Sequence, residues 1–116
     1  MSKQEEVNEI ELHMERAQEY IKEADALRRL RTNADFKAVV EQGYFEKNAV
    51  RLVGLKASPH MQTPEKQAGL LRAIDAIGEL QQHFNAVFMM AAEAETAVAE
   101  SREELAAMDA EEEVDS

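Results

Sequence analysis

The chain has 116 residues and a formal net charge of −11 at pH 7, and it contains neither cysteine nor tryptophan. Disulfides, thiolate nucleophiles and cysteine-ligated zinc are therefore excluded. Apolar residues make up 45% of the sequence but aromatic residues only 5%. This balance favours narrow contacts between helices over a thick globular interior, and it predicts an all-α protein.

The charge is distributed unevenly along the chain. Residues 1–26 carry −5, residues 27–66 carry +4, residues 67–92 carry −1 and residues 93–116 carry −9. Binding to a nucleic-acid backbone needs clustered lysine and arginine, so this balance opposes a nucleic-acid partner. We expect a protein partner instead.

The N-terminal residues 1–6 are too acidic and polar for a signal peptide. The longest apolar run, residues 86–92, is far shorter than the roughly 20 residues of a membrane span. These features predict a cytoplasmic location and no membrane partner.

The first predicted helix covers about residues 2–32. Its apolar residues follow one another at alternating spacings of three and four, as in the a and d positions of a coiled coil: Val7, Ile10, Met14, Ala17, Ile21 and Ala24. Arginines in the last turn complement the negative end of the helix dipole.

Two short helices are predicted next, over residues 34–42 and 44–57. Asn33 offers an N-cap for the first of them, and Gly43 is placed to end it as a left-handed C-cap. The residue before Pro59 is biased away from helix, which ends the second. We expect this pair to form a compact cap at the tip of a hairpin.

A long helix is predicted over residues 64–109, because Thr63 and Pro64 form a strong start and no breaker follows. An apolar stripe runs along it from Leu70 to Leu105, interrupted by Gln81, Glu95 and Arg102. Such polar residues can fix the register between helices. The favoured explanation is that they lie at the solvated edge of a stripe that drifts around the helix, because 3.6 residues per turn does not match a repeat of 3.5. Residues 111–116 form an acidic tail that is expected to fray.

Together these elements predict one domain, residues 1–110, folded as an antiparallel helical hairpin or coiled coil with a long C-terminal helix. A first helix of about 45 Å would cover the long helix only up to about residue 100. The distal part should then either protrude or pack on another chain.

Residues that could carry chemistry are few. Glu9 with His13, and Glu79 with His83, share helix faces at i, i+4 spacing, and His60 lies in a loop. Metal binding or acid–base chemistry is the alternative to simple surface pairing, but no second ligand pair accompanies either one. The glycines stand alone, so no phosphate loop exists. We expect no enzyme, no metal, no cofactor and no small-molecule substrate.

One apolar cluster is a candidate protein-binding surface, because too much of the helix circumference is apolar for a single two-helix contact. The candidate partner-binding residues are Phe84, Phe88, Met89, Met90, Val98 and Leu105. Coverage of the cluster by the short helices or the first helix is the favoured alternative. Methionine suits an adaptable docking surface for another subunit.

A basic group occupies the middle of the chain. Its members are Arg28, Arg29, Arg31, Lys37, Lys47, Arg51 and Lys56. Contact with nucleic acid is one interpretation. Pairing with the acidic residues of another copy is favoured over it.

Five short segments carry a resemblance to known proteins: Asn33–Lys37, Gly43–Phe45, Asn48–Val53, Met61–Gln62 and Ala73–Gly78. Through these segments about half of the chain resembles a small family of tailed-bacteriophage proteins encoded among virion and assembly genes. These motifs carry helix caps and packing residues, so the resemblance implies no functional residues. It implies a phage origin, with the protein in the host cytoplasm during infection or incorporated in the virion.

The leading expectation is a non-enzymatic phage structural or assembly protein. It would oligomerise through helix packing and dock on a larger component such as portal, capsid or tail. The alternative is a phage-encoded inhibitor that binds a host enzyme, with its acidic helix acting as a nucleic-acid mimic.

Overall fold

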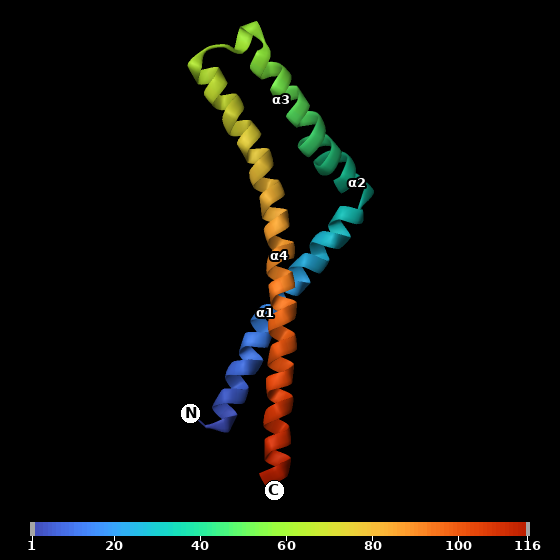
Figure 1. Ribbon diagram of the computed structural model, residues 1–116. Coiled ribbons are helices and arrows are strands. Elements are labelled where there is room, and N and C mark those ends of the chain that lie inside the picture. The colour runs from blue at the N-terminus through green and yellow to red at the C-terminus, as the bar shows by residue number, and fades with distance from the viewer. Residues whose placement is uncertain (1, 116) are drawn as a thin grey trace. The chain divides into compact units, whose positions relative to one another are not determined.

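The computed structural model describes residues 2–115, with side chains through residue 113, and this part of the chain is helical without strands. The all-α prediction with a long C-terminal helix is confirmed. The elements, labelled in Figure 1, are α1 (Lys3–Thr32), α2 (Ala34–Phe36), a π-helical segment (Lys37–Lys47), α3 (Asn48–Ala57), a 3-10 turn (Pro59–Met61) and α4 (Pro64–Asp115).

The predicted helix starts are confirmed at atomic detail. The Asn33 side-chain oxygen accepts the backbone N–H of Phe36 at 3.0 Å. The Thr63 hydroxyl accepts the N–H of Lys66 at 3.3 Å, and Pro64 is the first residue of α4. Each bond satisfies one of the donors that a helix start leaves unpaired. At the other end α4 continues beyond the expected residue 109 to Asp115, and Ser116 lies outside the described residues.

The prediction that a helix ends at Gly43 is wrong. The segment α2, the π-helical segment and α3 follow one another without a break, and no described glycine has positive φ. The Asn48 N–H donates to the carbonyl of Gly43, five residues earlier, which is the bond of a π-helix. The wider turn suits the apolar residues here, because Phe36, Val40, Phe45 and Ala49 are spaced by four, five and four.

The chain forms two compact units. The proximal unit, residues 27–86, contains the first part of α4. The distal unit, residues 2–26 with 87–115, contains the second part. Each unit packs a different segment against α4.

In the proximal unit the helical segment of residues 34–57 packs along the first part of α4. Leu52, Leu70 and Ile77 are buried in one cluster, and partly buried side chains surround them. The Phe84 ring lies 6.1 Å from that of Phe36 and 5.9 Å from that of Phe45, between centroids. Segment 34–57 is therefore a packing partner of α4 over several turns, not only a cap at its start.

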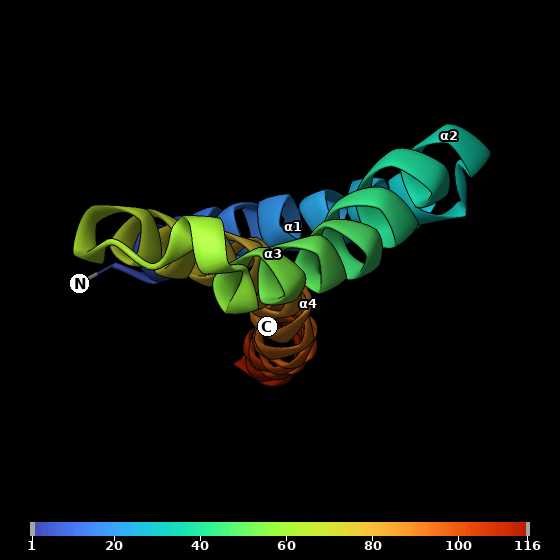
Figure 2. The ribbon, with the colours of Figure 1, turned by 90° about the horizontal axis from the view of Figure 1, so that it is seen from above.

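The connection between α3 and α4 is held by two glutamine side chains. The amide of Gln62 donates to the carbonyls of Lys56 and Ser58, at 2.9 and 2.7 Å. The amide of Gln67 donates to the carbonyls of Lys56 and Met61, at 3.0 and 2.7 Å. These bonds tie the last turn of α3 and the 3-10 turn to the start of α4, and the Lys56 carbonyl is one that the end of α3 leaves without a partner in the helix. Figure 2 looks down on this connection.

In the distal unit α1 runs antiparallel to the second part of α4. Ala17, Ala94 and Val98 form a buried cluster, with Met14, Ile21 and Ala97 packed against it. Near the start of α1, the Lys3 ammonium donates to the carbonyl of Met108 at 3.1 Å and lies 3.4 Å from a carboxylate oxygen of Glu112.

The expectation that α1 covers the long helix only to about residue 100 is therefore wrong. Segment 34–57 packs against the first part of α4, so α1 is available for the second part. Its contacts reach Glu112. Neither expected alternative, a protruding end or a second chain, is needed to place the distal part.

The polar residues in the predicted stripe of α4 lie at its solvated edge. Gln81, Glu95 and Arg102 are exposed, whereas Ala94 and Ser101 are buried. The interpretation of a drifting stripe is confirmed, because at 3.6 residues per turn the buried face moves to neighbouring positions.

Replacement of Leu52 by alanine should destabilise the proximal unit, because the side chain is only 3% exposed. We expect a loss of about 2–5 kcal/mol in the free energy of unfolding, measured by urea denaturation followed by circular dichroism. Val50→Ala is the matched control in the same helix, since Val50 is 73% exposed; its effect should stay within about 0.5 kcal/mol. Equal effects of the two variants would contradict this packing.

A second pair of variants tests the π-helical segment. Alanine is favoured over glycine in a helix by about 0.8–1 kcal/mol, and a Cβ at Gly78 would meet no atom within 4 Å. Gly78→Ala should therefore raise the thermal stability. A Cβ at Gly43 would lie 3.0 Å from the Ala38 carbonyl oxygen, so Gly43→Ala should give no such gain. An equal gain at both sites would argue against the π-helical backbone.

Candidate functional site

The contact between α1 and α4 in the distal unit is made largely by small side chains. Positions 87, 91, 94, 98, 101, 105 and 108 of α4 alternate spacings of four and three, and they are buried or partly buried. Among the described residues, no large side chain is fully buried. Alanine allows the two helices to approach closely, but it fills little volume. The pair therefore leaves a groove on each side of the contact.

The first groove, here the Tyr20–Met90 groove, has a volume of about 390 Å³. Tyr20 is 42% exposed and Met90 is 41% exposed, although both are large and apolar. The rim carries both signs of charge, because Arg16 and Glu93 line it together with His13. Such a surface suits the apolar face of a partner helix.

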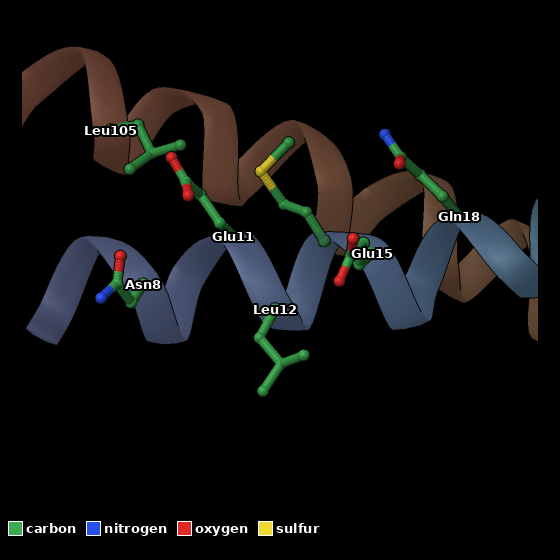
Figure 3. Close-up of a pocket in the computed structure, with 7 residues that line it drawn as sticks. Asn8, Glu11, Leu12, Glu15, Gln18 and Leu105 are labelled. Atoms are coloured by element: carbon green, nitrogen blue, oxygen red, sulfur yellow. The ribbon is translucent and has the colours of Figure 1, made fainter.

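The second groove, here the Leu12–Leu105 groove, has a volume of about 570 Å³. Figure 3 shows Glu11 reaching from α1 toward α4 beside Leu105, whereas Leu12 points away from α4. Glu15 also lines the groove, and no basic residue does. This groove therefore combines apolar walls with negative charge.

The structure separates the predicted partner-binding residues. Phe84 contacts other aromatic rings in the proximal unit, and Val98 is buried against α1 at 5% exposure. Phe88 is partly buried. Helices of the same chain therefore cover these three residues fully or in part, which is the alternative that the sequence favours.

The other candidates lie at the surface of the distal unit. Met90 lines one groove and Leu105 the other. Met89 is 66% exposed and lines neither. Partner binding by any of these residues stays a prediction.

Sequence reasoning missed Tyr20 and Leu12. Both are large apolar residues of α1 that fall outside its predicted stripe, and both are more than 40% exposed. An apolar side chain away from the buried face of an amphipathic helix was the available signal, because such a residue has no partner in the predicted pair.

The histidines are not gathered into a metal-binding group. His13 lies on the rim of the Tyr20–Met90 groove, and the His83 ring is 6.3 Å from that of Phe84. Within the described part of the chain, no three His, Cys, Asp or Glu residues come together as potential metal ligands. None of the helices described is long and apolar enough to cross a membrane.

Comparison with known proteins gives no relative: no family model, no curated protein and no solved structure matches this chain.

A larger residue in the narrow contact should force α1 and α4 apart. Ala94 is 5% exposed and packs with Ala17 and Val98, so Ala94→Leu should destabilise the protein by about 1–3 kcal/mol through overpacking. Ala92→Leu is the control two residues away, where the side chain is exposed. Thermal denaturation compares the stability of the two variants. A stabilising effect of Ala94→Leu would show that the contact between α1 and α4 has space for a larger side chain.

Proposed function

We propose that this chain is a non-enzymatic structural or assembly protein of a tailed bacteriophage. It associates with further copies through helix packing, and it docks on a larger virion component such as portal, capsid or tail. The phage setting rests on the sequence resemblance of residues 33–84.

The Tyr20–Met90 groove is the observation that supports docking. Large apolar side chains on α1 and α4 stay more than 40% exposed on both sides of a contact that is itself buried. Exposed apolar surface rimmed by polar residues is typical of protein–protein contact sites. A third helix laid along this groove would bury Tyr20 and Met90 and convert the pair into a bundle.

The charge of the distal unit favours a second candidate function. Residues 1–26 and 87–116 hold eighteen acidic and four basic residues, a formal charge of −14. An acidic helical surface of this kind can compete with nucleic acid for the basic surface of an enzyme. An inhibitor of that kind would act as a monomer, and its inhibition would be lost at high salt because the attraction is screened.

Mass spectrometry of purified particles tests the assembly role in a phage that encodes this chain. We expect the protein in virions or assembly intermediates at a fixed ratio to portal or capsid subunits. Met90→Glu should lower the amount recovered by at least about tenfold, because it places a charge in the apolar groove. Ala92→Glu should leave the amount unchanged, since Ala92 is exposed and lines neither groove.

Circular dichroism of both variants shows that each is folded. Absence of the protein from particles and intermediates alike would overturn the assembly role. Salt-sensitive inhibition of a nucleic-acid enzyme by a monomer would then support the second candidate.

A further inference from the structure

We propose that the Leu12–Leu105 groove of one copy binds the outer face of α3 of a second copy, so that chains associate head to tail. This inference rests on the proposed self-association and names the two surfaces that carry it. Both surfaces belong to the same chain but to different units, and they differ in charge.

The outer face of α3 is apolar although it packs on nothing in its own unit. Val50 is 73% exposed and Val53 is 63% exposed, and they lie one turn apart. Gly54 lies beside them, and a Cβ built on it would meet no atom within 4 Å. Leu52, on the opposite face, is buried against α4. The helix thus has one apolar face for its own unit and another that faces solvent.

Basic side chains flank this outer face. Lys47, Arg51 and Lys56 are exposed, and residues 47–57 contain no acidic residue. The Arg51 guanidinium donates to the side-chain oxygen of Asn48 at 2.8 and 3.1 Å, which holds it along the helix surface. The outer face of α3 is therefore that of a basic amphipathic helix.

The Leu12–Leu105 groove is complementary to this face in charge and length. Glu11 and Glu15 lie one turn apart along it, and its apolar walls include Leu12 and Leu105. Its lining on α1 runs from Asn8 to Gln18, a rise of about 15 Å, and the ten residues of α3 also rise about 15 Å. The groove and α3 therefore match in length along the helix axis and carry opposite charges.

The charges of the two units favour head-to-tail pairing over pairing of like with like. The proximal unit holds nine basic and six acidic residues, a formal charge of +3, against −14 for the distal unit. Two distal units repel each other, whereas a distal unit attracts the proximal unit of another copy. The Tyr20–Met90 groove suits α3 less well, because Arg16 and His13 line it.

Because this pairing uses two different surfaces, two chains joined by one contact still present one free groove and one free α3 face. These surfaces can bind each other, which closes a two-fold dimer with two equivalent contacts, or they can bind further copies until a ring closes. The assembly would then leave the Tyr20–Met90 groove of every copy open for the larger component.

Charge reversal tests the proposal in the full-length chain by sedimentation velocity over a range of concentrations. Glu15→Arg and Arg51→Glu should each weaken self-association by at least about tenfold, because each places like charges across the contact. An equimolar mixture of the two variants should associate again, since each then offers the partner that the other needs. The double variant E15R/R51E should also associate, because both charges are exchanged.

Glu9→Arg and Arg72→Glu are the controls, since both residues are exposed, neither lines a groove and neither belongs to α3. They should change association little, and circular dichroism shows whether every variant is folded. Oligomers that are insensitive to Glu15→Arg and Arg51→Glu would overturn this inference while leaving the proposed self-association intact. A strict monomer at all concentrations and at low salt would overturn both.

Discussion

The apolar stripe of α4 is the constraint on which the rest of the structure depends. An isolated helix is marginally stable in water, so a helix of 52 residues needs packing along its length. The chain meets this need with two different segments. Residues 34–57 pack on the first part of α4 through Leu52, and α1 packs on the second part through Ala17.

The two segments pack on α4 in different ways, and this difference determines where apolar side chains stay exposed. In the proximal unit, aromatic and branched side chains fill the contact. In the distal unit, alanines bring the helices close but leave large side chains such as Tyr20 and Leu12 outside the contact. A narrow seam thus creates exposed apolar surface at its edges, which is where the proposed partners bind.

Much of the local structure could be predicted from the sequence. The caps at Asn33 and Thr63 and the stripe of α1 follow from local chemistry and periodicity, and the structure agrees with them. The coverage of the distal part of α4 could not be predicted, because periodicity shows that a face is buried without showing against which segment. The same limit applies to the grooves, which exist only once α1 and α4 are paired.

Gly43 shows a different limit of prediction from the sequence, and the segment around it constrains how related sequences can vary. Glycine is typical both of helix ends and of positions where the backbone is crowded. At Gly43 the second explanation holds, because a Cβ there would lie 3.0 Å from the Ala38 carbonyl oxygen. The π-helical segment of 11 residues sets the rotation between the face of Phe36 and that of Leu52. Loss of one residue within it would change which face of α3 lies in line with Phe36. Related sequences should therefore vary in composition here more freely than in length.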